Sequence, residues 1–209
     1  MRTQLLLATA ALAALGALSA SAQVYSVNAV GYVNVTAPAN KFALVANQLT
    51  ASPNNTVSNV FAGVPEGTFV YTWTGTQFLI SAFELGEWTN PTADVGPGKG
   101  AFVLNRGSAV NVTFVGEVPQ GSLQTAYTAG FNMVASKVPQ AGNLQTVLGF
   151  VPGEGDTVLT WSVANQKYNL FTYEFGEWAP APGPVLAVGE GFFLNAKAAG
   201  SWNRTFSVN

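Results

Sequence analysis

Cysteine and histidine are both absent from this sequence, and only 9% of its residues are charged. The absence of cysteine excludes disulfides, thiolate metal sites and cysteine nucleophiles. The absence of histidine removes the most common general base and the most common metal ligand. The eight basic residues do not cluster in the sequence, so nothing in it favours nucleic acid or an anionic membrane surface as a partner.

Long apolar runs are scarce too, and the one that exists lies near the N-terminus. Residues 5–20 form an apolar run that follows Arg2 and leads into an Ala-Ser-Ala triplet at 20–22. This pattern predicts a secretory signal peptide over residues 1–22, cleaved after Ala22. No later segment approaches the ~20 apolar residues that a membrane-spanning helix needs, so we expect no membrane span after signal removal.

The expected mature chain is therefore a secreted protein of the periplasm, the cell surface or the extracellular space. Cleavage removes Arg2, which leaves 7 basic and 10 acidic residues and a net charge near −3. Without disulfides such a domain must be stabilised by its core, and 48% hydrophobic residues are enough to build one.

What the sequence does contain is an internal repeat. The blocks recur in the same order at an offset of about 90 residues, which is strong support for a duplication. The matched blocks are KFALVANQL (41–49) with GFNMVASKV (130–138), residues 54–73 with 142–161, FELGEW (83–88) with YEFGEW (173–178), and VGPGKGAFVLN (95–105) with VGEGFFLN (188–195).

Each copy has the pattern of β structure. Short runs rich in β-branched and aromatic residues, such as TFVYTW (68–73) and TVLTW (157–161), are separated by turn residues. Residues 55–61 and 143–150 each begin with an asparagine that can cap a short helix. We therefore predict an all-β fold of two tandem, related small β-sandwich- or barrel-like modules, each with at most one short helix.

The repeat also sets the expected organisation of the chain. A strand-like N-terminal segment that includes VGYVNV precedes the first copy, and we expect it to pair with the last strand, NRTFSVN (203–209). The alternative is strand addition to a neighbouring molecule, which would make the protein self-associating. The predicted boundaries are 23–40 for the N-terminal strand segment, 41–118 for module 1, 119–129 for a tight connection and 130–209 for module 2.

This order of strands and turns resembles a β-rich module of exported bacterial proteins, which reads W-N-L-V-S-x-P early and P-G-x-G-Y-W-V late. The segments VYSVNAVGYVNV (24–35), VTFVGEVPQGS (112–122) and VGEGFFLN are similar to those of exported Verrucomicrobiota proteins that carry two such modules. The resemblance spans the whole mature chain, although Phe42 and Phe131 stand where the module usually has tryptophan. It implies export and the tandem β fold, and it implies no established activity.

The motifs FELGEW and YEFGEW each place two glutamates three residues apart, which is compatible with a pair of catalytic carboxylates. A retaining glycosidase needs carboxyls about 5–5.5 Å apart, and an inverting one about 6.5–9.5 Å. The strand-like flanks and the glycines predict instead one β-turn built twice, with the glycines at positive φ and the following glutamates exposed. The predicted structural turn residues are Gly86, Glu87, Gly176 and Glu177.

No other motif supports catalysis or a cofactor. VGPGKG (95–100) lacks the Ser or Thr that follows the lysine of a phosphate-binding loop, and Glu190 stands where this copy has Lys99. The only aspartates, Asp94 and Asp156, fall at non-matching positions of the repeat, which argues against an aspartic-protease pair. We predict no enzyme, no cofactor and no metal site.

The aromatic residues are the best candidates for binding. Trp73 and Trp161 end matched strands and are expected in the core. The ligand-binding candidates beside the turns are Trp88, Trp178, Tyr173 and Phe83, which can stack on sugar rings if they are exposed. The predicted function is a non-catalytic exported structural or interaction protein that can self-associate. The alternative is a module that binds extracellular polysaccharide through its repeated aromatics, and the least favoured is a carboxylate-dependent glycoside hydrolase.

Overall fold

The computed structural model describes residues 29–208, and these are almost entirely β structure, as predicted. Its one helix is the short α2 (Val57–Val60). The strands are β1 (Val30–Ala37), β2 (Phe42–Val45), β3 (Thr68–Trp73), β4 (Phe78–Glu84), β5 (Glu87–Trp88), β6 (Ala101–Asn105), β7 (Val110–Glu117), β8 (Gly121–Tyr127), β9 (Gly130–Ala135), β10 (Gly142–Asn143), β11 (Thr157–Ser162), β12 (Lys167–Glu174), β13 (Glu177–Ala179), β14 (Val185–Leu186), β15 (Gly191–Ala196) and β16 (Gly200–Phe206).

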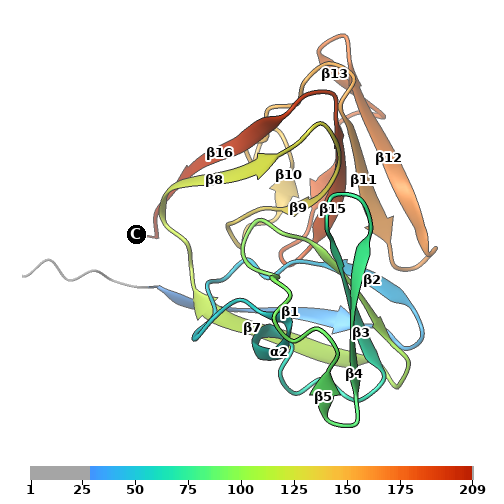
Figure 1. Ribbon diagram of the computed structural model, residues 1–209. Coiled ribbons are helices and arrows are strands. Elements are labelled where there is room, and N and C mark those ends of the chain that lie inside the picture. Colours follow the sequence, from blue (N-terminus) through green and yellow to red (C-terminus); the bar gives the residue numbers. More distant parts are fainter. Residues whose placement is uncertain (1–28, 209) are drawn as a thin grey trace, which may run out of the picture.

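The repeat in the sequence is a repeat in strand order. One five-stranded sheet has the order β2-β6-β3-β4-β5, and the other has the order β9-β15-β11-β12-β13. These are the same arrangement built from equivalent segments, and Figure 1 shows the second sheet above the first. The alternation that suggested strands follows burial: β3 reads TFVYTW, and every second side chain is buried.

Each copy also contains a separate two-stranded ribbon, and here two expectations were wrong. The N-terminal strand β1 pairs with β7 at the end of the first copy, from Val30 opposite Glu117 to Ala37 opposite Val110. It does not pair with the C-terminal strand β16, whose partner is β8. Residues 121–127, expected as part of a connection, are therefore a strand equivalent to β1. The first part of the N-terminal segment, residues 23–28, lies outside the described residues.

The short helix is present in the first copy alone. In the second copy the corresponding residues make successive turns, in which the N–H groups of Val147 and Leu148 both donate to the carbonyl of Asn143. The Asn143 side chain accepts from the N–H groups of Gln145 and Thr146, as a capping residue does. The expected cap is thus made in the copy that has no helix.

The hydrophobic residues form one core in each repeat and a third cluster between them. The first core is centred on residues such as Phe61 and Phe114, and the second on residues such as Phe150 and Phe192. The third cluster joins the two sheets around Phe102 and its equivalent Phe193. The two repeats therefore pack against each other through a shared hydrophobic interface.

The two repeats also exchange their glycine loops across this interface. The loop before β6 bonds to β9 of the other copy, where the Ala135 N–H donates to the Gly98 carbonyl at 3.0 Å. In the reciprocal contact the Ala46 N–H, just after β2, donates to the Gly189 carbonyl at 2.8 Å. Gly100 and Gly191 lie between these contacts, so close that a Cβ on Gly191 would lie 3.0 Å from the Cα of Gly100.

Candidate functional site

Each GEW motif forms the tip of a β-hairpin, between β4 and β5 in the first copy and between β12 and β13 in the second. Leu85 and Gly86 have φ values of 54° and 80°, and Phe175 and Gly176 have values of 55° and 79°. Two successive central residues with positive φ are the signature of a type I′ turn. The structure therefore has the same turn in both copies.

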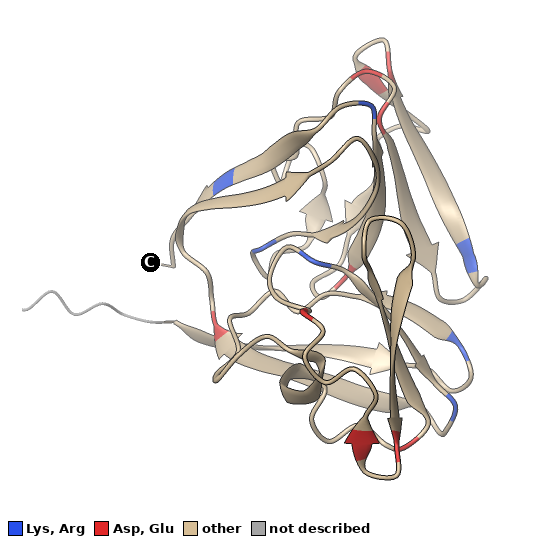
Figure 2. Cartoon of the chain, viewed as in Figure 1, with Lys and Arg blue, Asp and Glu red and all other residues tan. Residues whose placement is uncertain are grey.

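The glutamates of these motifs are exposed and form two separate pairs. Glu84 is opposite Glu87 in the first hairpin, and Glu174 is opposite Glu177 in the second. The two hairpins lie at opposite ends of the molecule (Figure 1), and Figure 2 shows acidic groups at both ends. The glutamates of the two motifs therefore do not converge on one cleft.

The hairpin tips display the two most exposed large apolar residues among those described. Leu85 is 91% exposed and Phe175 is 98% exposed. Asparagine is the preferred residue at this position of a type I′ turn, because other L-residues pay roughly 1–2 kcal/mol to adopt positive φ. The sequence reasoning did not single out these two residues. The signal was present, however, as Leu or Phe before Gly where Asn is expected.

The second tip is also held in place by a side chain. The carboxylate of Glu154 accepts hydrogen bonds from the N–H groups of Phe175 and Gly176, both at 2.9 Å. Glu154 lies in the loop before β11, so the bonds tie the turn to the neighbouring chain segment. The phenyl ring of Phe175 is therefore presented to solvent on a fixed turn.

A hollow of about 500 Å³ lies beside the first hairpin. Its wall is aromatic: the ring centroid of Trp88 is 5.2 Å from that of Phe83 and 6.5 Å from that of Phe61. Ser58 and Glu87, which carry a hydroxyl and a carboxylate, also line the hollow, so polar residues form a rim beside its aromatic wall. The full lining is Ser58, Phe61, Ala62, Gly63, Phe83, Gly86, Glu87, Trp88 and Pro91.

The matching tryptophan of the second repeat is not available to a ligand. Trp178 is only 6% exposed and packs in the core, where its ring contacts the half-buried Tyr173. The chain after β13 passes over it, since a Cβ on Gly183 would lie 2.5 Å from the indole Cδ1. The hypothesis of twin exposed aromatic sites is therefore wrong for Trp178, although Trp88 and Phe83 do line a hollow.

The loops after the two hairpins explain this difference. In the first copy Asn90 donates to the Ile80 carbonyl at 2.6 Å, which holds the loop against β4. In the second copy Asn143 donates to the Pro182 carbonyl at 2.8 Å, which holds the loop near the core. The residues are TNPTA (89–93) in one case and APAPGP (179–184) in the other. Divergent loops thus leave one tryptophan accessible and cover the other.

Hydrogen bonding also distinguishes Trp88 from the other tryptophans. The indole N–H donates to a protein oxygen at 2.9–3.0 Å in four of the five tryptophans. The acceptors are the carbonyls of Phe131, Phe42 and Leu148 and the side chain of Gln145, for Trp73, Trp161, Trp202 and Trp178 respectively. Within residues 29–208, Trp88 makes no such bond, so its donor is free for water or a ligand.

Trp73 and Trp161 form a reciprocal contact between the repeats. Each indole donates at 2.9 Å to the carbonyl of a phenylalanine in the other copy, Phe131 for Trp73 and Phe42 for Trp161. Both rings are half-exposed and pack against the cluster around Phe102 and Phe193. They therefore belong to the interface between repeats, and neither lies in the core of its own copy.

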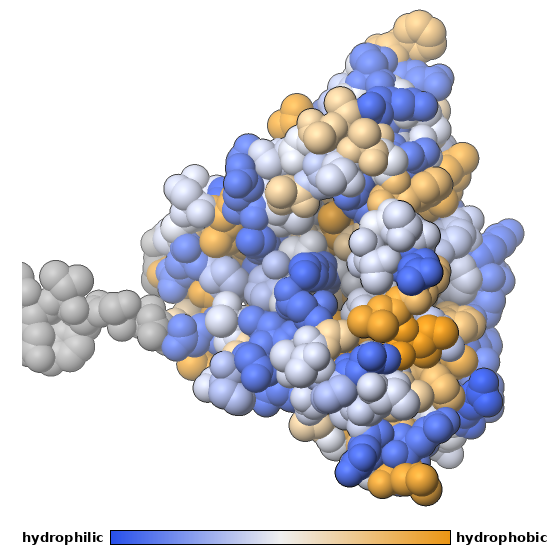
Figure 3. Space-filling view, in the orientation of Figure 1, coloured by the Kyte–Doolittle hydropathy of each residue, from blue (hydrophilic) through white to orange (hydrophobic). Residues whose placement is uncertain are grey.

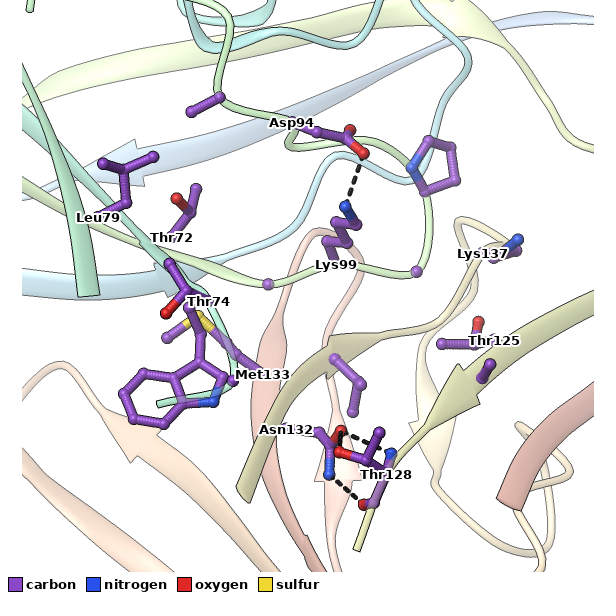
Figure 4. Close-up of a pocket in the computed structure, with 18 of the residues that line it drawn as sticks. Thr72, Thr74, Leu79, Asp94, Lys99, Thr125, Thr128, Asn132, Met133 and Lys137 are labelled. Atoms are coloured by element: carbon purple, nitrogen blue, oxygen red, sulfur yellow. Dashed lines mark hydrogen bonds and ion pairs between the residues drawn. The ribbon is translucent and has the colours of Figure 1, made fainter. Parts of the chain in front are cut away.

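A second hollow of about 500 Å³ opens between the repeats beside Trp73 (Figure 4). Several of its polar side chains are already engaged with the chain itself. Lys99 forms an ion pair with Asp94 at 2.6 Å, and the Asn132 amide makes four hydrogen bonds to its own turn. Partial burial would raise the pKa of Asp94, but hydrogen bonds from Lys99 and Gly96 hold it below its usual value. These groups are occupied in holding loops, so this hollow is the weaker candidate for a binding site.

No family, no curated protein and no solved structure matches this chain. Among residues 29–208, no helix is long and apolar enough to cross a membrane. The same residues contain no group of three or more acidic side chains placed to hold a metal ion. The hairpin tips and the hollow at Trp88 are therefore the features on which a function can be argued.

Proposed function

We propose that this chain is a non-catalytic exported structural protein that associates with further copies of itself through its hairpin tips. The observation that carries the proposal is Phe175, a phenyl ring placed in solvent by a residue with positive φ. Its equivalent, Leu85, has the same two unfavourable properties. Because the fold gains nothing from either side chain, the cost of roughly 1–2 kcal/mol at each turn is best explained by a contact outside the molecule.

A second copy of the chain offers a surface of suitable chemistry. Four of the apolar side chains exposed on β4 and β12 lie where the two sheets meet, and Figure 3 shows apolar surface over β4. They form two matched pairs, and Phe78 and Tyr168 both contact the rings of Phe102 and Phe193. We name this surface the inter-repeat patch, which consists of Phe78, Ile80, Tyr168 and Leu170.

Charge favours this pairing over contact between two tips. The second tip is surrounded by the carboxylates of Glu154, Glu174 and Glu177. The inter-repeat patch has basic neighbours: Lys167 precedes Tyr168, and Lys41 precedes Phe42, whose N–H donates to Gln166. An acidic apolar tip and a basic apolar patch are complementary. Such a contact between different surfaces is heterologous, so it propagates into chains of molecules.

The test replaces each tip residue by asparagine in the mature protein. Phe175→Asn and Leu85→Asn create the preferred Asn-Gly turn, so each should raise stability by about 1 kcal/mol, or roughly 2–4 °C in Tm. The same variants should abolish concentration-dependent association in sedimentation velocity. Val151→Asn is the matched control, since it removes another exposed apolar side chain, 80% exposed, that belongs to neither hairpin.

Two results would reject the proposal. One is a wild-type mature protein that stays monomeric up to millimolar concentration at low salt. The other is a double tip variant that associates as strongly as the wild type. Strand exchange of β1 between copies is the competing route, and it would leave association intact in the tip variants.

A further inference from the structure

We infer that the hollow at Trp88 is a binding site for one pyranose ring of an uncharged polysaccharide. The inference concerns a ligand site beside the first hairpin tip and not the apolar tip side chains themselves, so it goes beyond the proposed function. It rests on three observations: an open aromatic wall, a free indole donor and a polar rim, all in the first repeat.

The wall fits the flat face of a sugar. Sugar rings present C–H groups on one face, and these stack on indole and phenyl rings. Trp88 is half-exposed and lies at an angle of 37° to Phe83, with their centroids 5.2 Å apart. Pro91 closes another side of the hollow. A volume of about 500 Å³ accommodates one ring of a chain that continues into solvent.

The free donor indicates that the ligand carries hydrogen-bond acceptors. The other four tryptophans each donate their indole N–H to an acceptor within the protein. Trp88 therefore differs from the indoles that this fold uses for packing. A purely apolar ligand would cover the N–H of Trp88 and leave it without a partner, which weakens binding. A sugar hydroxyl can accept this bond.

The rim defines the charge and the remaining polar contacts. The Glu87 carboxylate can accept hydrogen bonds from sugar hydroxyls, and the Ser58 hydroxyl can donate or accept. Glu84 lies opposite Glu87 in the same hairpin, so two carboxylates lie near the hollow. They repel uronic acids and sulfated sugars, which selects uncharged glycans.

The second repeat provides an internal control. Its hairpin has the same Glu-Trp sequence and the same turn, but Trp178 is buried and bonded to Gln145. Replacing Trp178 therefore makes the same side-chain change as replacing Trp88, but at a buried position that a ligand cannot reach. Glu177 is the corresponding control for Glu87.

The experiment measures binding of cellohexaose and chitohexaose to the mature protein by calorimetry, with an alginate hexamer as the anionic probe. At least one uncharged hexasaccharide should bind, and the alginate should not. Trp88→Phe keeps a ring in the wall but removes the donor, so affinity should fall about 3- to 10-fold. Glu87→Gln should weaken binding by a similar factor. Trp178→Phe and Glu177→Gln should leave the affinity within twofold of the wild type.

The inference is overturned if neither hexasaccharide binds at millimolar concentration, or if alginate binds more tightly than both. It is also overturned if folded Trp88→Phe, checked by circular dichroism, binds as the wild type does. Phe175→Asn separates this site from the tips. It should bind sugar normally even though self-association is lost, so either idea can fail without the other.

Discussion

A close backbone approach between the two repeats allows a quantitative test of the interface. A Cβ on Gly191 would lie 3.0 Å from the Cα of Gly100 and 3.1 Å from the carbonyl oxygen of Val45. Favourable contacts between such atoms are about 3.5–4.0 Å, so the repeats must separate by roughly 0.5–1 Å. Overpacking of this kind lowers stability by about 1–3 kcal/mol. Alanine also reduces the conformational entropy of the unfolded chain, which raises stability by about 0.4–1 kcal/mol. Gly191→Ala should therefore lower stability by about 1–2 kcal/mol.

Gly100→Ala is the matched control for this prediction. Its nearest contact is the Cγ of the Met133 side chain at 3.0 Å, and the nearest backbone atom lies at 3.4 Å. Neither glycine has positive φ, so backbone strain does not differ between them. The Gly100 variant should stay within about 0.5 kcal/mol of the wild type in urea unfolding followed by circular dichroism. A Gly191 variant as stable as the Gly100 variant would refute the argument that backbone contact fixes the repeats together.

Three further predictions concern the turns and the titrating carboxylates. Gly86→Ala and Gly176→Ala should each cost on the order of 1 kcal/mol in urea unfolding, because both glycines have positive φ; no loss at either site would contradict the turn geometry. Burial raises the pKa of Glu190, so its ionisation above about pH 4 penalises the folded state, and Glu190→Gln should raise Tm at pH 7 but not at pH 3. The pKa of Asp94 is instead lowered despite partial burial, by hydrogen bonds from Lys99 and Gly96. Its small contribution should be present at neutral pH and disappear as pH falls below about 4, so Asp94→Asn and wild type should converge in Tm at pH 2.5.

The strands and turns could be predicted from the sequence because each depends on a few neighbouring residues. Alternation in TFVYTW follows from a strand with one buried face, and Gly86 follows from a turn that needs positive φ. The partner of β1 could not be predicted in the same way. Both β7 and β16 alternate, and the sequence does not say which of two similar strands a third one will meet. The choice is made by the tertiary structure, in which each repeat completes its own ribbon.

The candidate site shows the same limit. Phe83 and Trp88 were correctly placed beside a turn. The matching motif, however, predicted the same accessibility for Trp178 as for Trp88. The difference arises from the path of residues 179–184, which depends on the bond from Asn143 to the Pro182 carbonyl, 39 residues along the chain. The exposed tips were missed for another reason. Apolar residues usually lie in the core, so composition alone does not mark Leu85 and Phe175, and only the turn position they occupy does.

The two copies remain alike where they contact each other and differ in the loops after the hairpins. Trp73 and Trp161 make the same bond in opposite directions, so a change in one copy alone would disrupt the shared interface. The loops after the hairpins make no such reciprocal contact, and they differ in sequence and path. A new binding site can therefore arise in one of these loops without weakening the joint between the repeats. The open hollow at Trp88 lies beside such a loop, whereas the hollow between the repeats lies at the joint, where side chains are already engaged with each other.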